Sequence, residues 1–275
     1  MNKKNLKFVF FGTPNVASET LEILKENGYM PSLIITSPDR PQGRKMLITP
    51  PPVKVWAEKN NIVFLQPEKL DNEFISKLST FNFQLFIVVA YGKIMPEELL
   101  NMTKFGSINI HYSLLPKYRG ASPVESAILA GDEETGITIQ KMEFKMDTGP
   151  IVAQEIVKIL SDEKAQELRA RLIKIGGELL VKTLPEFTEN KIKPIPQDEL
   201  KATHCKKIKK EDGLVDLNDS PIKNYNKFRA YATWPRTFFF ENNKRIIITD
   251  AKIENGEFKI LKIIPENGKE INYKP

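Results

Sequence analysis

Two polar side chains at the end of an apolar run are the sharpest candidates for chemistry in this chain. The run Gly106–His111 is predicted to be a strand, with Asn109 and His111 two positions apart at its end. Because strand side chains alternate, the amide and the imidazole should share one face, opposite Ile108 and Ile110. An amide beside an imidazole suits acyl transfer, since the amide can donate to a developing oxyanion and the imidazole can move a proton. The alternative is a histidine satisfied by backbone groups at a strand end.

A carboxylate in a later loop is the third candidate. Asp147 lies in the run Met146–Gly149, which follows the predicted strand Gly136–Met142. A carboxylate close to His111 would raise the pKa of the imidazole and orient its ring. An ordinary turn is the competing interpretation, because Asp-x-Gly is common in turns.

The elements that must position these residues alternate between strands and helices. Strands are predicted at 6–11, 33–36, 84–90, 106–111 and 136–142, and helices at 15–27, 54–60, 68–78, 96–102 and 123–130. The run 84–90 is apolar on both faces, which is typical of a central parallel strand. This order predicts an α/β fold with a doubly wound, mostly parallel sheet, in which ligands bind at the carboxyl ends of the strands.

The pattern changes after Asp162. A long helix is predicted over 164–187, and a proline-containing linker follows it. Short strands are then predicted at 236–240, 245–248 and 258–263, which indicates a small β-barrel. Trp234 and the aromatic run Phe238–Phe240 are expected in the core of that barrel. The predicted limits are 1–188 for the first domain, 189–205 for the linker and 206–275 for the barrel.

Basic residues are concentrated in the last quarter of the sequence. Residues 201–275 contain 16 Lys and Arg against 10 Asp and Glu, which accounts for the whole net charge of +6. A neutral body with a basic appendage favours a polyanionic partner, whereas the other interpretation is a solvated basic surface. Lys206 and Lys207, near the start of this region, suit contacts with phosphate groups.

Composition excludes several other classes of protein. With 41% hydrophobic and 28% charged residues, the chain is typical of globular proteins. The single cysteine, Cys205, excludes a disulfide framework within the chain and a multi-cysteine zinc site. No apolar stretch approaches the roughly 18 residues that span a bilayer, so a cytoplasmic protein without membrane contact is expected. The run Phe11–Pro14 lacks the spaced glycines of a dinucleotide-binding loop, which argues against NAD.

Two runs carry a resemblance to a known family. SINIHYSLLPKYRGASP at 107–123 and MDTGPI at 146–151 are similar to active-site segments of the 10-formyltetrahydrofolate-dependent formyltransferases, and the resemblance covers 6–160 almost continuously. It implies a Rossmann-like catalytic domain, 10-formyltetrahydrofolate as formyl donor and no metal. The catalytic residues that it implies are Asn109, His111 and Asp147. The folate contacts that it implies are Ser113, Leu114, Leu115 and Pro116.

Three further segments resemble the branch of this family that formylates methionine attached to initiator tRNA. They are PDRPQGRKMLITPPPVKVWA at 38–57, KATHCKKIKKEDGLVDL at 201–217 and FRAYATWPRTFFF at 228–240. The resemblance implies an OB-like C-terminal barrel that binds tRNA, with initiator methionyl-tRNA and the folate as partners of a monomer. The implied tRNA contacts are Arg44, Lys45, Lys206 and Lys207. The family's C-terminal domain runs on past the segment that resembles IIPENGKEI, so the final strand or helix is expected to be shortened or absent in this sequence.

The implied reaction is attack of the methionine amine on the formyl carbon. Asn109 and His111, protonated or neutral, would hold the oxyanion, and Asp147 would set the charge state of the histidine. Two other hypotheses stay open: the same chemistry on an amino sugar nucleotide or a purine-pathway amine, and an RNA-binding protein with a decayed catalytic domain. The basic C-terminal region and the 38–52 insertion count against a small acceptor. The presence of all three catalytic side chains counts against decay.

Overall fold

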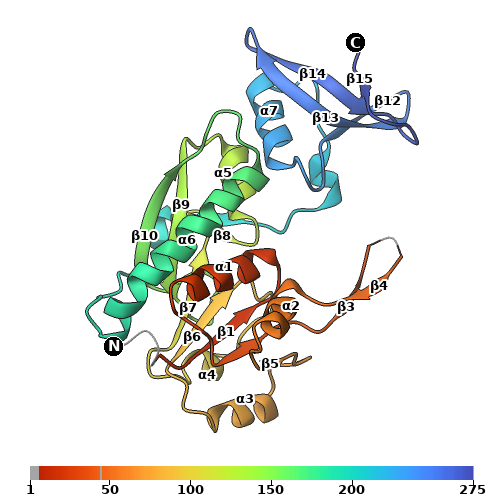
Figure 1. Cartoon of the computed structure of the whole chain (residues 1–275). Helices are drawn as coiled ribbons and strands as arrows, with labels where there is room; N and C mark the ends of the chain where they lie inside the picture. Colours follow the sequence, from red (N-terminus) through yellow and green to blue (C-terminus); the bar gives the residue numbers. More distant parts are fainter. Residues whose placement is uncertain (1–5, 44, 275) are drawn as a thin grey trace.

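A computed structural model describes residues 6–43 and 45–274 of the chain (Figure 1). Its centre is a seven-stranded sheet with the order β10-β9-β7-β6-β1-β2-β5. The pairings that link β5, β2, β1, β6 and β7 are parallel, whereas β9 is antiparallel to both β7 and β10. The prediction of a doubly wound, mostly parallel sheet is therefore confirmed. The strands are β1 (Phe8–Gly12), β2 (Leu33–Ile35), β5 (Phe64–Leu65), β6 (Leu85–Val89), β7 (Ser107–His111), β9 (Glu134–Lys141) and β10 (Ile151–Lys158).

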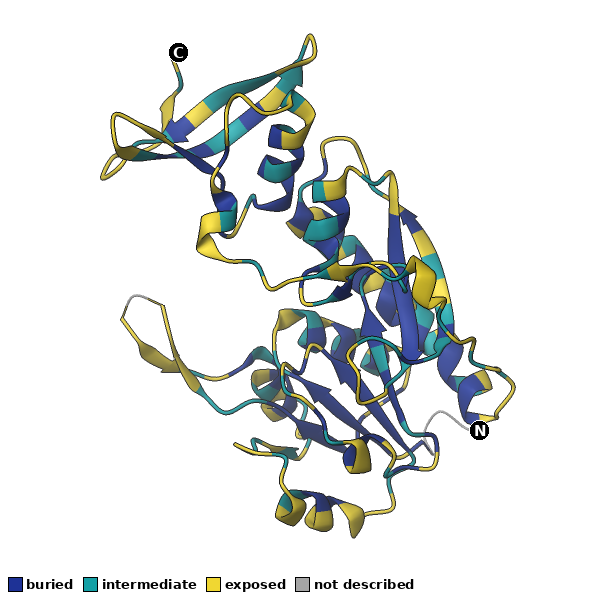
Figure 2. Ribbon diagram, turned by 180° about the vertical axis from the view of Figure 1, so that it is seen from behind, coloured by how far each residue is buried: buried dark blue, intermediate teal, exposed yellow. Residues whose placement is uncertain are grey.

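Helices cover both faces of the sheet, because its central strands are apolar on both sides. Phe8 and Phe10 of β1 pack into one core with the first and the longest helices, while Val9 and Phe11 pack into a second core on the other face. The central strands are buried along their length, as the dark blue ribbon of Figure 2 shows. The helices of this domain are α1 (Asn15–Glu26), α2 (Pro52–Lys59), α3 (Asn72–Ser79), α4 (Glu97–Leu100), α5 (Pro123–Ala130) and α6 (Ala165–Thr188).

A hairpin projects from the first domain between β2 and α2 (Figure 1). It consists of β3 (Arg40–Gln42) and β4 (Leu47–Thr49), which pair in antiparallel fashion. This hairpin occupies the 38–52 insertion, for which no strands were predicted. Lys45 lies exposed in its turn, and Arg44 lies outside the described residues.

The C-terminal part is a four-stranded antiparallel sheet. Its order is β12-β13-β14-β15, so the sheet is open, with β12 and β15 at its edges. The unpredicted helix α7 (Pro221–Ala230) packs against it, and Phe228 joins the small core. Phe238 and Phe239 are buried, but Trp234 and Phe240 are 54% and 58% exposed, so their predicted place in the core is wrong. The strands are β12 (Phe238–Glu241), β13 (Lys244–Glu254), β14 (Glu257–Ile264) and β15 (Ile271–Asn272).

The segment between the two parts lies along the first domain. Ile195 pairs with Ile151 in an isolated bridge. Further on, β11 (His204–Cys205) pairs with β8 (Arg119–Gly120) in the loop that follows β7. The limits 1–188, 189–205 and 206–275 stay predictions, but the segment 189–205 is docked on the first domain over much of its length. In the part of the chain that the structure covers, no helix is both long and apolar enough to cross a membrane.

Candidate active site

Asn109 and His111 lie at the carboxyl end of β7, between β6 and β9. Asn109 is in register with Gln140 of β9, and His111 with Thr138. Ile108 and Ile110 belong to the core on the α6 side. The amide and the imidazole line a cleft with a volume of about 580 Å³, to which Asp147 also contributes. The structure therefore brings the three predicted catalytic side chains to one cavity.

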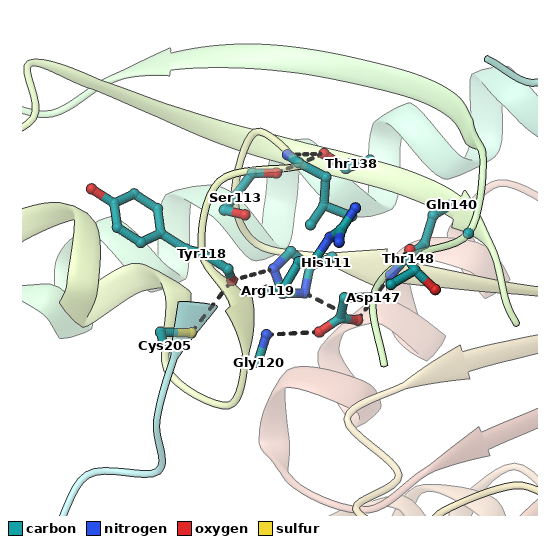
Figure 3. A network of polar contacts seen from close by, with 12 residues as sticks. His111, Ser113, Tyr118, Arg119, Gly120, Thr138, Gln140, Asp147, Thr148 and Cys205 are labelled. Carbon is teal, nitrogen blue, oxygen red and sulfur yellow. Dashed lines mark hydrogen bonds and ion pairs between the residues drawn. The ribbon is translucent and has the colours of Figure 1, made fainter. Parts of the chain in front are cut away.

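His111 is fixed by a backbone carbonyl (Figure 3). Its Nε2 lies 2.9 Å from the carbonyl oxygen of Tyr118. Because a carbonyl only accepts, Nε2 must carry a hydrogen, and Nδ1 of the neutral ring then holds a lone pair. This Nδ1 lies 3.7 Å from Oδ1 of Asp147.

Burial decides the charge of this histidine. The residue is only 5% exposed. Burial lowers the pKa of His111 below its ordinary value of 6.5, while the Asp147 carboxylate and the Tyr118 hydrogen bond act in the opposite direction. Desolvation is the largest of these effects, so the ring is neutral at pH 7 and can accept a proton at Nδ1.

Asp147 is held by two N–H donors. Its Oδ2 accepts from the Gly120 backbone N–H at 2.8 Å, and its Oδ1 accepts from Nε2 of Gln140 at 2.9 Å. Such bonds fix the direction of the carboxylate. Gly120 must be a glycine, because its φ is +123° and a Cβ there would lie 2.1 Å from the Cys205 carbonyl oxygen. Gly149 also lacks room for a side chain, since its Cβ would lie 1.7 Å from the Lys141 carbonyl oxygen.

The Asn109 amide is the one member of the trio whose polar atoms are left available. The side chain is half-buried and faces the cleft. Among the described residues it has no hydrogen-bond partner, whereas its neighbours His111 and Asp147 are both bonded. A half-buried amide with free N–H groups can donate them to a ligand that enters the cleft.

Several apolar side chains line the cleft. Ile94, Phe144 and Met146 line it and are 76%, 64% and 66% exposed. Tyr91 lies beside them, and burial raises its pKa to about 12, so its phenol stays neutral. Apolar side chains around a few directed polar groups are typical of a site for a small organic ligand.

The structure does not bring the four implied folate contacts into this cleft. Ser113 is buried, and its Oγ donates to the Lys117 carbonyl at 2.6 Å. Leu115 is buried too, and its N–H donates to Thr138 Oγ1. The side chains of Leu114 and Pro116 line a second cavity, with a volume of about 510 Å³. These residues hold the loop after β7, and their direct contact with folate stays a prediction.

The basic residues implied as tRNA contacts are dispersed. Lys45 lies on the hairpin and Lys206 is exposed after β11. Lys207 is also exposed, and it lines the cleft that contains His111. A side chain from the basic C-terminal region thus reaches the candidate catalytic site.

Sequence reasoning missed three groups that hold His111 and Asp147: the Tyr118 carbonyl, the Gly120 N–H and the Gln140 amide. Backbone groups leave no signal in residue types. Gln140 does leave a signal in the sequence, because it is a polar residue inside the predicted strand 136–142. In the structure its side chain is buried, with an exposure of 2%. Within the described ranges, no group of three or more His, Cys, Asp or Glu could hold a metal ion.

Comparison with known families identifies two matching regions. Residues 5–184 match the family described as Formyl transferase, and residues 207–272 match the family described as Formyl transferase, C-terminal domain. The methionyl-tRNA formyltransferase of Caldicellulosiruptor saccharolyticus is 40% identical, over 92% of this chain and 82% of that protein. The enzyme of the same name from Staphylococcus epidermidis is 41% identical, over 91% of this chain and 81% of its own.

Solved structures share the fold at lower identity. The methionyl-tRNA formyltransferase from Clostridium thermocellum aligns with a TM-score of 0.62 at 18% identity, over 98% of this chain and 100% of that one. An N-formyltransferase from Helicobacter canadensis, solved with folinic acid and dTDP-3-aminofucose, aligns with a TM-score of 0.72 at 19% identity, over 95% of each chain.

Proposed function

The chain belongs to the formyl transferase family, and we propose that it transfers the formyl group of 10-formyltetrahydrofolate to the α-amino group of methionine esterified to initiator tRNA. The product is N-formylmethionyl-tRNA, the aminoacyl-tRNA for initiation of translation. The relatives named methionyl-tRNA formyltransferase are about 40% identical over about 90% of the chain. The chain also matches both the formyl transferase family and the family of its C-terminal domain. Translation places the enzyme in the cytoplasm.

Asn109 supplies the oxyanion donor. The methionine amine attacks the formyl carbon and forms a tetrahedral intermediate whose oxygen carries a negative charge. The amide of Asn109, which has no hydrogen-bond partner in the described part of the chain, faces the cleft and can donate to this oxygen without first losing a bond to those residues. A preorganised donor of this kind stabilises the transition state more than the ground state, because charge develops only as the amine attacks.

His111 moves the proton. The amine becomes positively charged as it attacks and must lose one proton, whereas N10 of the departing tetrahydrofolate must gain one. Nδ1 of neutral His111 accepts the proton from the amine and delivers it to N10 as the carbon–nitrogen bond breaks and the carbonyl re-forms. The bond from Nε2 to the Tyr118 carbonyl leaves Nδ1 as the only basic position of the ring.

Asp147 stabilises the imidazolium that forms during this transfer. Its carboxylate lies 3.7 Å from Nδ1 and is held in place by Gly120 and Gln140. A fixed negative charge at this distance stabilises the protonated ring that forms after Nδ1 accepts the proton from the amine.

The apolar side chains that line the cleft suit contact with the ring system of the folate. Ile94, Phe144 and Met146 expose their side chains there, and burial of that surface against a flat heterocycle is favourable. Ser113, Leu114, Leu115 and Pro116 lie in the loop after β7 and outside this cleft, and their contact with folate stays a prediction.

The tRNA binds across the basic parts of the chain. Lys206 and Lys207 lead from the C-terminal part to the cleft, and Lys45, together with Arg44, belongs to the hairpin insertion. Lysines position a nucleic acid through its phosphates. Because the catalytic trio comes from a single chain, the mechanism needs no second copy, and we propose that the enzyme works as a monomer.

The observation that carries the proposal is the meeting of Asn109, His111 and Asp147 in one cleft. The test is to incubate the protein with 10-formyltetrahydrofolate and initiator tRNA, either charged with methionine or uncharged, and to measure N-formylmethionine after hydrolysis of the ester. We expect product only with charged tRNA. Equal or faster formylation of an amino sugar nucleotide would assign the enzyme to a small acceptor instead.

A further inference from the structure

One side chain of the segment between the two parts reaches the loop that carries the catalytic carboxylate. Nε2 of Gln197 donates to the carbonyl oxygens of Asp147, at 2.9 Å, and of Gly149, at 2.7 Å. These residues are about fifty positions apart in the sequence. The amide thus ties both sides of the Asp147 turn to residue 197.

A buried arginine orients that amide. Arg119, whose side chain is 1% exposed, donates from Nε and Nη2 to Oε1 of Gln197, at 3.0 and 2.8 Å. The same guanidinium binds both carboxylate oxygens of Glu199. With its oxygen held by Arg119, the Gln197 amide presents its N–H groups to the two carbonyls, and its Nε2 also lies 3.5 Å from Oε1 of Gln140.

The turn at Asp147 needs such support. Asp147 has a φ of +54°, a left-handed conformation that costs free energy in residues other than glycine. Its carboxylate is fixed from one direction by Gly120 and Gln140. Gln197 fixes the main chain of the same residue from another direction.

We propose that Gln197 is a positioning residue, which holds the backbone of Asp147 so that its carboxylate stays directed at His111. This inference rests on the proposed function, because it assigns Gln197 to the same reaction. It makes the segment 189–205 a structural part of the active site rather than a tether between domains.

A second set of contacts from this segment supports the same conclusion. The Tyr118 N–H donates to Oγ1 of Thr203, and the Cys205 thiol donates to the Tyr118 carbonyl, at 2.9 and 3.3 Å. That carbonyl is the one that binds His111 (Figure 3). Gln197, Thr203 and Cys205 therefore hold the main chain of the residue that carries the carboxylate and the backbone of the residue whose carbonyl binds the imidazole.

The test compares Gln197→Ala and Gln197→Glu with Asp198→Asn. Asp198 is the exposed neighbour of Gln197, and its carboxylate bonds within its own turn and to Lys201. We expect Gln197→Ala to lower kcat about 10-fold to 30-fold with KM for both substrates within about twofold, because small misplacement of a catalytic group slows the chemical step. Gln197→Glu should lower kcat at least as much, since its carboxylate would face two carbonyl oxygens. Asp198→Asn should retain the wild-type kcat.

Two further measurements separate positioning from a general structural role. In an Asp147→Asn background, Gln197→Ala should lower kcat less than about threefold, because its effect passes through the carboxylate. The acidic limb of the kcat–pH profile should also move to lower pH in Gln197→Ala, since His111 loses part of the influence of Asp147. The other titratable side chains that line the cleft are Tyr91, Lys93, Tyr112, Glu143 and Lys207, and none of them is changed in this variant.

Several outcomes would overturn the proposal. They are a kcat for Gln197→Ala within twofold of wild type, an equal loss in the Asp147→Asn background, or an unchanged acidic limb in a variant of reduced kcat. Failure of the proposed function looks different, because the wild-type protein itself would then formylate no charged tRNA. Circular dichroism and Tm of each variant establish that the proteins compared are folded.

Discussion

The catalytic cleft and the β3–β4 hairpin differ in how firmly their side chains are held. In the cleft, the imidazole, the carboxylate and the main chain of Asp147 are bonded to backbone and side-chain groups from three separate segments: the loop 118–120, strand β9 and the stretch that contains Gln197. On the hairpin, Met46, Leu47 and Ile48 are 66%, 63% and 66% exposed, as its yellow ribbon in Figure 2 indicates. Among its described residues, the side-chain contacts with the rest of the domain are at its base, where Asp39 accepts hydrogen bonds from Lys54 and Gln66 and Arg40 pairs with Glu68.

This difference indicates a division of work. Proton transfer and oxyanion stabilisation depend on fractions of an ångström, so the groups that perform them need several partners. A segment that contacts a large, charged partner can instead adjust its side chains on binding. We therefore expect substitutions in the cleft to lower kcat, and substitutions on the hairpin to raise KM for tRNA alone.

The largest effect should come from Asn109→Ala. Loss of one oxyanion donor typically lowers kcat by about 100-fold to 1,000-fold. Because the Asn109 amide has no partner among the described residues, its removal should leave Tm nearly unchanged. Steady-state kinetics with charged tRNA and thermal unfolding measure the two quantities.

Asn101→Ala is the matched control for this variant. Asn101 is an exposed residue at the end of α4, so kcat should stay at the wild-type value. If folded Asn109→Ala kept a kcat within threefold of wild type, the role of oxyanion donor assigned to Asn109 would be wrong.

Asp147→Asn should have the next largest effect and should change the pH dependence. We expect kcat to fall about 100-fold, since the amide cannot stabilise the imidazolium by charge. Burial lowers the pKa of His111 and the Asp147 carboxylate raises it, so without this charge the pKa falls further. Neutral His111 is the active form, which places the acidic limb of the wild-type profile below pH 6.5 and that of the variant lower still.

Profiles of kcat between pH 4.5 and 8 on saturating substrates check this sign. A limb that moves to higher pH in Asp147→Asn would mean that the protonated ring is the active form, and the role given to Nδ1 would then be wrong.

The sheet and the pair on β7 could be predicted because both depend on local pattern. Runs such as 84–90 are apolar throughout, and strand alternation alone separates Asn109 and His111 from Ile108 and Ile110. The β3–β4 hairpin could not be predicted in this way, because its residues are exposed and lack apolar alternation. Its strands instead follow from pairing across a turn.

Long-range contacts explain most of what the sequence did not reveal about the site. Gln197 lies in a stretch that its two prolines mark as a linker, and no local pattern connects it to Asp147 fifty residues earlier.

Trp234 is a residue whose burial was predicted but is not found in the structure. Its aromatic character predicted burial, but residue type does not state which side of a small sheet a residue will occupy, and the side chain is 54% exposed.

Lys207 and Lys206 test how the basic C-terminal region contributes to the cleft. Lys207 lines the cleft and Lys206 does not. Lys207→Ala should lower kcat/KM for charged tRNA about tenfold, since it would remove a charge beside the reacting ester. Lys206→Ala should lower it only a few-fold and reduce the slope of log K against log salt concentration by about 1. Equal effects of the two variants on kcat/KM would contradict the position assigned to Lys207.

The smallest effect should come from the double variant Leu47→Ser with Ile48→Ser on the hairpin. Both side chains are more than half exposed, so we expect the free energy of unfolding to change by less than about 0.5 kcal/mol. If the hairpin contacts tRNA through this apolar surface, KM for charged tRNA should rise about three-fold to ten-fold, because one or two exposed aliphatic contacts contribute about 1 kcal/mol. The rate with a small surrogate amine should not change, since the double variant alters neither the catalytic trio nor the apolar side chains that line the cleft. A loss of equal size with both acceptors would mean that the hairpin acts on the cleft itself, and the division between the two regions would then not hold.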